Sequence, residues 1–522
     1  MVFNFFTAYF LIYFTIDGRR IERQMYNIGT IRVSTRVDQY SVAFALILGL
    51  IGSSVGLWSY YYLSDERRYV RFILLLLLFL VSMVILIFSS NLFVSTIGWD
   101  GLGVTSFFLV IFYKNRKRLG SGMITALTNR VGDCFLFCCL GLWLIRYSCL
   151  SLIFIIIIRI TKSAQIPFSS WLPSAMAAPT PVSALVHSST LVTAGVYIMI
   201  RYSYYETWYL TVLGITTMLM AGFRACAERD LKKVVALRTL SQLGVIIVSL
   251  GVKEKSFCFF HLIAHASFKA LLFICVGVGI HSLYGTQDSR SFGGLSSFLP
   301  STFLLVSTLS LIGCAFTSGF YRKDAILETL ESQEGCSWTI LFFFIGIGLT
   351  TCYSFKLITH SYASFTHESA MSLGCEKWEV KVPMAALGFS SIITGSLISD
   401  YCNLIIITIP TSEKVIPLMC IAAGISLGRL APLVYRPYLR RLMMLSPATT
   451  QFSLSEFGLQ KDLDKGCLEL ISRSVSPITL TLITHYSRYY TIGILVISMF
   501  YFVYVQYCDK GLVVSCKYLH KP

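Results

Sequence analysis

Long apolar segments, separated by short polar stretches, recur along most of the 522-residue chain. Residues 72–88 are an example, and no charged residue interrupts the sequence from there to Trp99. An α-helix needs about 20 apolar residues to cross the hydrocarbon core of a bilayer. The pattern therefore predicts an all-α polytopic membrane protein with about 14–15 transmembrane helices, two of them interrupted.

The predicted spans follow one another with short connections. The first apolar segment, residues 2–16, is barely long enough to cross, and a polar, basic stretch at 17–39 follows it. Further spans are expected near residues 41–62, 72–90, 91–112, 122–145, 182–201, 205–223, 231–251, 257–281, 338–359, 383–409 and 415–434. We divide the chain into N-terminal transmembrane helices (1–90), a core of two halves (91–360, split into about 91–201 and 205–360) and C-terminal core helices (361–434).

The C-terminal part of the chain has a different pattern. Between residues 435 and 488, apolar residues such as Leu459 and Leu463 recur at helical spacing, and charged residues occupy the other faces. This is typical of an amphipathic helix that lies along a surface. The apolar segment 489–510 then predicts a C-terminal transmembrane anchor, and a tail follows at 511–522.

Composition supports a membrane protein. The hydrophobic fraction is 55%, only 13% of the residues are charged, and the mean hydropathy is +0.70. A soluble chain carries about a quarter charged residues. The net charge of +17 would suggest nucleic acid in a soluble protein. Here the basic residues fall mostly between apolar segments, as at 114–118, where they orient helices and contact anionic lipid.

Neither a cofactor motif nor a targeting segment is evident. The sixteen cysteines are scattered without a Cys-x-x-C spacing, and no Gly-rich dinucleotide or phosphate loop is present. Iron–sulfur ligation needs clustered thiolates, so we expect none in this chain. Residues 2–16 have neither the features of a cleavable signal nor those of a transit peptide.

Polar residues concentrate in one stretch that should lie at membrane depth, residues 159–197. This stretch carries Lys162 and His187 together with four prolines: Pro167, Pro173, Pro179 and Pro181. Proline breaks a helix, and broken backbone survives at membrane depth only where protein buries it or water reaches it. An ionisable residue there indicates a functional site, although a lysine in a loop is the alternative for Lys162.

A second interruption occupies the corresponding place in the other half. The apolar segment 300–316 is expected to break at 317–324, around Lys323 and Asp324, and to resume as helix. A pair of interrupted spans in two halves is the best sequence indication of an inverted-repeat transporter and of its ion site.

Two acidic residues lie within apolar spans. Asp100 follows Trp99 in the middle of a predicted helix, so it should be paired or neutral, with Lys162 as the expected partner. The alternative for Asp100 is a charge that reaches the headgroups. Asp133 is a second candidate, and its alternative is a helix-surface pair with Arg130 at i, i+3.

Three titratable residues share one face of the span near 257–281. His261, His265 and Lys269 are spaced i, i+4 and i+8, and histidine titrates closest to physiological pH. The pattern favours a proton relay. Two histidines at this spacing could also bind zinc, but no acid or cysteine nearby completes a ligand set.

These motifs carry a family resemblance. Lys162-Ser-Ala-Gln-Ile-Pro, Trp171-Leu-Pro-Ser-Ala-Met, Pro179-Thr-Pro-Val-Ser-Ala-Leu and His187-Ser-Ser-Thr-Leu-Val-Thr-Ala-Gly-Val-Tyr, in this order, resemble the antiporter-like subunits of respiratory complex I. The lateral amphipathic helix with its anchor resembles the one member of that family that has such an element, and not the two shorter members.

The resemblance implies a function. It implies a core membrane subunit that translocates protons across the mitochondrial inner membrane, coupled to electron transfer from NADH to ubiquinone in partner subunits. NAD, FMN, iron–sulfur clusters and ubiquinone would then belong to those partners. The implied partners are other membrane-arm and accessory subunits, neighbouring antiporter-like subunits contacted through residues 435–488, and membrane lipids, but no nucleic acid.

The resemblance also implies residue roles. Asp100 stands where the family usually has glutamate, which makes it the switch beside Lys162. Lys323 would be the exit site toward the intermembrane space. The remaining relay candidates by motif are His187, His261, His265, Lys269, Asp133 and Asp324. The family's usual His-Ala-Phe-Phe-Lys motif has Ser267 in place of one aromatic residue here, which leaves the titratable residues intact.

Three other functions remain open at this point. One is a subunit of a multisubunit cation/proton antiporter, and another is a haem or iron–sulfur membrane oxidoreductase. The third is a purely structural subunit, which would apply if Asp100 cannot reach Lys162.

Overall fold

The computed structural model describes thirteen segments of the chain. They are residues 21–28, 31–113, 115–144, 158, 160–202, 208–252, 254–283, 285–289, 298–314, 317–332, 337–362, 377–401 and 411–434. The chain divides into two compact units, Met1–Leu433 and Val434–Pro522, and the second lies outside the described residues apart from Val434. The predicted first segment at 2–16, the lateral helix and the anchor therefore lie outside the described residues as well.

A β-hairpin occupies most of the stretch that the sequence marked only as polar and basic. Strand β1 (Ile21–Ile28) pairs antiparallel with β2 (Ile31–Val37), with an irregularity between Gln24 and Tyr26. Residues 31–37 alternate β-branched and polar side chains, and this period of two is typical of a strand. The prediction of a wholly helical chain missed this local pattern.

Helices make up the rest of the described structure. The first group is α2 (Gln39–Tyr62), α3 (Tyr69–Phe88), α4 (Leu92–Val110), α5 (Arg116–Leu144), α7 (Trp171–Ala175), α8 (Thr180–Val182), the π-helical segment η1 (Ser183–Thr190) and α9 (Leu191–Tyr202). The second group is α10 (Trp208–Ala227), α11 (Leu231–Gly251), α12 (Lys255–Ser282), α13 (Phe298–Ile312), α14 (Ser318–Ser332), α15 (Ser337–Tyr362), α16 (Trp378–Tyr401) and α17 (Thr411–Val434).

The described helices confirm a multi-pass membrane fold. Within the described residues, nine helices are long and apolar enough to cross a bilayer, and two shorter apolar helices, Phe298–Ile312 and Val415–Gly428, accompany them. The expected total of about 14–15 spans stays a prediction, because several of the predicted segments lie outside the described part.

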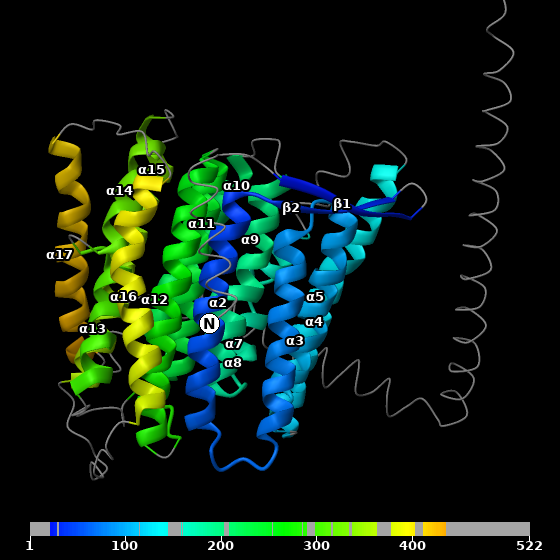
Figure 1. The fold of residues 1–522 in the computed structure, drawn as a ribbon. Coiled ribbons are helices and arrows are strands. Elements are labelled where there is room, and N and C mark those ends of the chain that lie inside the picture. Colours follow the sequence, from blue (N-terminus) through cyan, green and yellow to red (C-terminus); the bar gives the residue numbers. More distant parts are fainter. Residues whose placement is uncertain are drawn as a thin grey trace, which may run out of the picture. The chain divides into compact units, whose positions relative to one another are not determined.

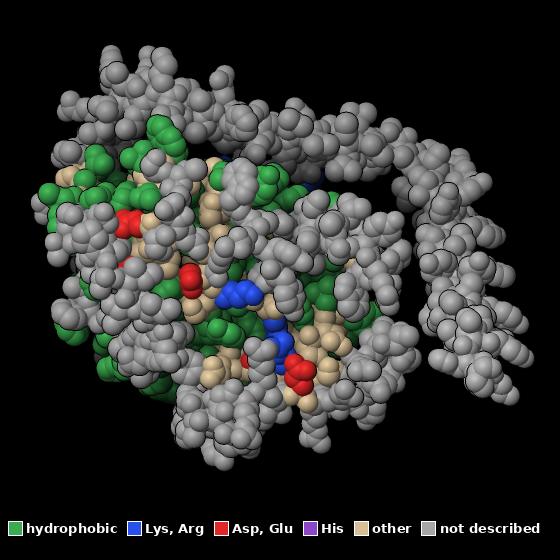
Figure 2. All heavy atoms as spheres, turned by 90° about the horizontal axis from the view of Figure 1, so that it is seen from above, with side chains coloured by type: hydrophobic (Ala, Val, Ile, Leu, Met, Phe, Trp, Pro, Cys, Tyr) green, Lys and Arg blue, Asp and Glu red, His purple; other side chains and the backbone are tan. Residues whose placement is uncertain are grey.

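Two spans that carry candidate residues, Thr180–Tyr202 and α12, lie inside the bundle. α12 packs against α2, η1, α13 and α16, and Figure 1 shows α3, α4 and α5 on one side of it and α13, α15 and α17 on the other. In the most apolar 18-residue window of each span, all residues of Thr180–Tyr202 and 94% of those of Lys255–Ser282 are buried, against 39% for Tyr69–Phe88. A lipid-facing helix keeps an apolar outer surface, so the internal helices are those that can hold polar side chains. At the end of the bundle seen in Figure 2, basic and acidic side chains lie among hydrophobic ones.

The chain is interrupted at the two places that the sequence indicated, with one correction. The first helical segment stops at Lys162, and Ala164 has a positive φ of 54°. At the second place, α13 stops at Ile312, Gly313 has φ 84° and α14 starts at Ser318, so the helix is already interrupted before the predicted 317–324 and has resumed within that stretch. Glycine accepts this left-handed conformation without a steric cost and ends the helix there. Lys323 consequently lies in the second turn of α14 and not in the break itself.

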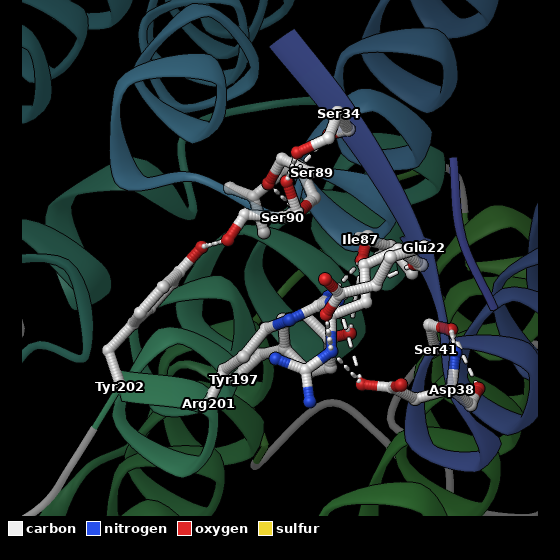
Figure 3. A network of polar contacts seen from close by, with 12 residues as sticks. Glu22, Ser34, Asp38, Ser41, Ile87, Ser89, Ser90, Tyr197, Arg201 and Tyr202 are labelled. Atoms are coloured by element: carbon white, nitrogen blue, oxygen red, sulfur yellow. Dashed lines mark hydrogen bonds and ion pairs between the residues drawn. The ribbon is translucent and has the colours of Figure 1, made fainter. Parts of the chain in front are cut away.

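A buried polar network fixes the hairpin to the bundle (Figure 3). Arg36 of β2 forms an ion pair with Asp38 at 2.6 Å, and Arg201 of α9 lies 3.8 Å from the same carboxylate. The Arg201 guanidinium also donates to the backbone oxygen of Ile87, which the Tyr197 hydroxyl approaches at 3.1 Å. The carbonyl of Ile87 lies in the last turn of α3, where helix carbonyls lack partners within the helix.

Candidate functional site

Lys162 is fully buried at the end of the first helix segment. Its ammonium nitrogen donates to the backbone oxygen of Trp99 in α4 at 2.6 Å, and it lies 3.7 Å from the centre of the Trp99 ring. The indole of Trp171 donates to the carbonyl of Thr161 at 3.0 Å and holds this turn in place. The lysine that the sequence predicted at membrane depth is thus a buried cation with specific partners, and the alternative of a loop lysine is wrong.

Asp133 joins the same group through Trp99. The indole nitrogen of Trp99 donates to one carboxylate oxygen of Asp133 at 2.9 Å, and Arg130 pairs with the other oxygen at 3.3 Å. The Asp133 side chain is 8% exposed and that of Arg130 is 55% exposed. The i, i+3 pair that the sequence offered as the alternative is present, yet its acid points inward to the lysine site. The relay role of Asp133 stays a prediction.

Asp100 lies near the lysine but not against it. It is partly exposed, and no ion pair within 4.0 Å joins it to Lys162 in the described part of the chain. Both acids attract the lysine electrostatically, and the contribution of Asp133 is larger than that of Asp100. The direct pairing of Asp100 with Lys162 stays a prediction.

His187 lies on a distorted helical turn. Residues Ser183–Thr190 form a π-helical segment, in which the hydroxyl of Thr190 donates to Leu185 at 2.7 Å. Such segments are frequently found at functional sites. The His187 ring is buried at 6.2 Å from the Trp171 ring, and neither of its nitrogens has a hydrogen-bond partner among the described residues.

The three predicted residues of α12 are all fully buried. His261, His265 and Lys269 follow one another along the helix, and the rings of the two histidines are 6.4 Å apart. α12 contacts η1 at one side and α13 and α14 at the other. It therefore lies between the two interrupted segments. Among the described residues, no three histidine, cysteine or acidic side chains are grouped to hold a metal ion.

Lys323 repeats the arrangement of Lys162 at the second interruption. Its ammonium nitrogen donates to the backbone oxygen of Ile312, the last residue of α13, at 2.6 Å. The hydroxyl of Thr350 on α15 lies 3.4 Å from the same nitrogen. A helix C-terminus presents unpaired carbonyls that attract a cation. The side chain of Asp324 lies outside the described part of the structure.

Sequence reasoning missed the residues that connect these charges. Trp99 offers its carbonyl to Lys162 and its indole N–H to Asp133, and Thr350 contacts Lys323. In the sequence Trp99 was notable only as the neighbour of Asp100. A tryptophan beside an acid within a span was the available signal, because a buried indole N–H normally needs an acceptor.

Known families match most of the chain. A family model described as NADH:quinone oxidoreductase/Mrp antiporter, TM, matches residues 89–350. The model for the complex I chain 5 N-terminus matches 26–73, and that for the NADH dehydrogenase subunit 5 C-terminus matches 353–457. The NADH-ubiquinone oxidoreductase chain 5 of Anopheles gambiae is 42% identical over 416 residues, which are 74% of this chain and 72% of the relative. The chain belongs to the chain 5 family of NADH-ubiquinone oxidoreductase.

A further relative agrees with this assignment, and two solved structures have a similar fold. Chain 5 of Artemia franciscana is 46% identical over 366 residues, which are 67% of each chain. The Mrp complex from Dietzia sp. DQ12-45-1b matches with a TM-score of 0.70 and 22% identity, covering 94% of this chain and 60% of the other. An archaeal membrane-bound sulfane sulfur reductase matches with a TM-score of 0.68 and 17% identity, covering 82% and 92%. At these identities the structures establish the fold alone.

The chain 5 family assignment confirms three predictions. The chain is an antiporter-like membrane subunit of complex I, it crosses the mitochondrial inner membrane several times, and its helices adopt the antiporter-like fold. The Mrp likeness fits the alternative of a cation/proton antiporter, but the chain 5 models at both ends of the match favour complex I.

Proposed function

We propose that this chain 5 family member carries protons through the membrane at two buried lysines, Lys162 and Lys323. The ammonium of Lys162, fully buried at a helix interruption and 2.6 Å from the Trp99 carbonyl, carries the proposal. Burying a charge so far from water is costly, so ionisable residues at such depth usually have a function. A lysine removed from water also gives up its proton more readily.

The acids beside Lys162 control whether the lysine holds or releases its proton. Asp133 and Asp100 both attract the lysine, so an approach of either acid holds the proton on Lys162. Withdrawal of an acid, or its protonation, releases that proton. Because Asp133 is held by Trp99 and Arg130, Asp100 is the acid with more freedom to move. Asp133 therefore attracts Lys162 from a fixed position, and Asp100 acts as the switch.

The buried residues of α12 link the two lysines. His187 lies on η1, which packs against α12, and α12 in turn packs against α13 and α14. We assign to His187, His261, His265 and Lys269 the transfer of protons along this axis, and to Lys323 the exit. Asp324 is kept as a relay candidate from its motif.

Lys162→Met in the intact complex tests the proposal. Methionine fills a similar volume without a charge, so the variant should assemble normally but take up far fewer protons into vesicles per NADH oxidised. Lys255→Met, at the exposed start of α12, is the matched control and should behave like the parent. Normal proton uptake by the Lys162 variant at normal assembly would refute the proposal.

Electron transfer belongs to other subunits in this proposal. The chain would draw the driving force from NADH oxidation and ubiquinone reduction in partner subunits and would hold no redox group itself. An optical spectrum of the purified chain tests this, since a haem or iron–sulfur band would contradict it.

The C-terminal region is proposed to contact neighbouring subunits. Residues 435–488 have the amphipathic pattern of a helix on a surface, and an apolar anchor at 489–510 follows. Truncation after Leu433 should release the chain from neighbouring antiporter-like subunits while its core stays in the membrane. Unchanged co-migration with the complex on a native gel would exclude this role.

A further inference from the structure

A pair of cysteines lies between α10 and α15, away from the lysine sites. Cys226 is next to the last residue of α10, and Cys352 lies in the C-terminal half of α15. Their thiols face each other within hydrogen-bonding reach. Both are free thiols.

Close approach of the two helices brings these thiols together. A Cβ atom added at Gly222 would lie 3.1 Å from the Cβ of Leu349, and one added at Gly346 would collide with the side chain of Met218. Met218, Gly222 and Cys226 are spaced by four residues and so form one face of α10. Because Gly222 and Gly346 have no side chains, α10 and α15 can pack closely enough for Cys226 to meet Cys352.

Positive charge surrounds the thiol pair. The ammonium of Lys356 donates to the backbone oxygen of Cys226 at 2.6 Å. The buried guanidinium of Arg238 donates to the carbonyl of Tyr353, next to Cys352 in the chain, and lies 4.9 Å from the Tyr353 ring centre. Two nitrogens of Arg238, Nε and Nη1, have no hydrogen-bond partner within the described segments. A nearby cation stabilises a thiolate, which is the reactive form of cysteine.

Neither cysteine is fully exposed. Cys226 is partly exposed near the end of α10, and Cys352 is 8% exposed. Cys258 and Cys275 of α12 are fully buried, and Cys134 and Cys138 of α5 are exposed. Reactive cysteines combine partial exposure with positive surroundings, and the Cys226–Cys352 pair has both.

We propose that Cys226 and Cys352 form a redox-active dithiol, which a hydroperoxide oxidises to a disulfide that links α10 to α15. The thiolate of one of the two cysteines attacks a peroxide oxygen, which gives a sulfenic acid and releases water or an alcohol with the proton from that cysteine. The thiol of the other cysteine then attacks the sulfenic sulfur, and its proton leaves with the hydroxyl group as a second water. Two thiols are oxidised by two electrons and one peroxide is reduced.

The Cys226–Cys352 disulfide would join α10 to α15, the helix whose Thr350 contacts Lys323. Thr350, which contacts Lys323, precedes Cys352 by two residues on α15. Disulfide formation does not depend on the proposed proton transfer, so it can be tested by chemistry alone.

The test uses the intact complex in its membrane. Membranes are treated with hydrogen peroxide, free thiols are alkylated, and the unreduced digest is analysed by mass spectrometry. We expect a Cys226–Cys352 cross-linked peptide that disappears after dithiothreitol. Oxidation of Cys134 and Cys138 while Cys226 and Cys352 stay alkylatable would overturn the proposal.

Two variants sharpen this test. Cys226→Ser should assemble normally and lose the cross-link, whereas Cys420→Ser on α17, which is also partly exposed, should retain it. Lys356→Met should slow cross-linking several-fold at unchanged assembly, because the thiolate loses a neighbouring cation. A cross-link that survives in Cys226→Ser, or an unchanged rate in Lys356→Met, would contradict the assigned chemistry.

Discussion

The ammonium of Lys162 is bound to the backbone of Trp99, with a nitrogen–oxygen distance of 2.6 Å. The indole of the same tryptophan donates to Asp133 at 2.9 Å. Trp99 thereby holds a buried cation and a buried acid at a fixed separation, without direct contact between them. In the proposed function, this arrangement attracts the lysine to the acid while the proton of Lys162 stays exchangeable.

Trp99→Phe should separate these two functions. Phenylalanine keeps the carbonyl and an aromatic face for Lys162 but removes the N–H that holds Asp133. A hydrogen bond to a charged group contributes about 1.5–3 kcal/mol, so we expect proton uptake per NADH to fall roughly tenfold at normal assembly.

Trp58→Phe is the matched control for this change. Trp58 is equally buried, and its indole nitrogen has no hydrogen-bond partner in the described part of the chain. Removing that N–H should leave uptake unchanged. Equal uptake in the two variants would mean that the Trp99–Asp133 hydrogen bond has no part in pumping.

The sequence predicted those elements that depend on local pattern. The span at 231–251 coincides with α11, because the segment between the charged start and Gly251 is predominantly apolar and long enough to cross a bilayer. The lysines at interrupted helices were predictable because proline, glycine and charge in an apolar segment all need a specific environment. The partners of those lysines were not, since backbone carbonyls from α4 and α13 carry no sequence signal.

Gly313→Ala should destabilise the second interruption. Gly313 has φ 84°, a conformation that costs a non-glycine residue about 1–2 kcal/mol, and an added Cβ would lie 3.1 Å from Cδ of Lys323. We expect a lower melting temperature of the complex and impaired proton uptake. Gly56→Ala in α2 is the control, because a Cβ there meets nothing within 4 Å and alanine favours the helix. Equal melting temperatures for the two variants would show that Gly313 is not under this constraint.

Arg201→Met should loosen the hairpin. The guanidinium of Arg201 lies between Asp38 and the Ile87 carbonyl, and removing one member of a buried charged network costs about 3–5 kcal/mol. Hydrogen exchange of amides at 31–37 should therefore become faster by at least tenfold. Tyr202→Phe removes only the neighbouring hydrogen bond to Ser90, at 2.9 Å, and should have a smaller effect. Unchanged exchange in Arg201→Met would indicate that the hairpin is held by other contacts.

Asp133→Asn tests whether the charge of Asp133 is needed for proton uptake. Asparagine can still accept the indole N–H of Trp99, but it no longer attracts Lys162 or pairs with Arg130. Proton uptake should fall at normal assembly. Arg130→Gln removes only the partly exposed partner of Asp133 and should have a minor effect, because such pairs contribute about 1 kcal/mol or less. A larger loss of uptake in Arg130→Gln than in Asp133→Asn would mean that Asp133 serves only as the partner of Arg130 on the helix surface.

Asp100 decides whether the switch lies where the family motif puts it. Asp100→Asn removes the charge at nearly constant volume, and an acid at about 4 Å contributes roughly 4 kcal/mol to a lysinium at an effective dielectric of about 20. If the motion of Asp100 toward Lys162 drives proton binding, this variant should lose most proton uptake at normal assembly. Asp100→Glu restores the family's usual residue and one further methylene of reach, so it should preserve or improve uptake. A role in packing alone predicts the opposite order, since glutamate would disturb the neighbourhood of Trp99 and asparagine would be tolerated. Parental uptake in Asp100→Asn would therefore remove Asp100 from the mechanism and leave Asp133 as the acid that controls Lys162.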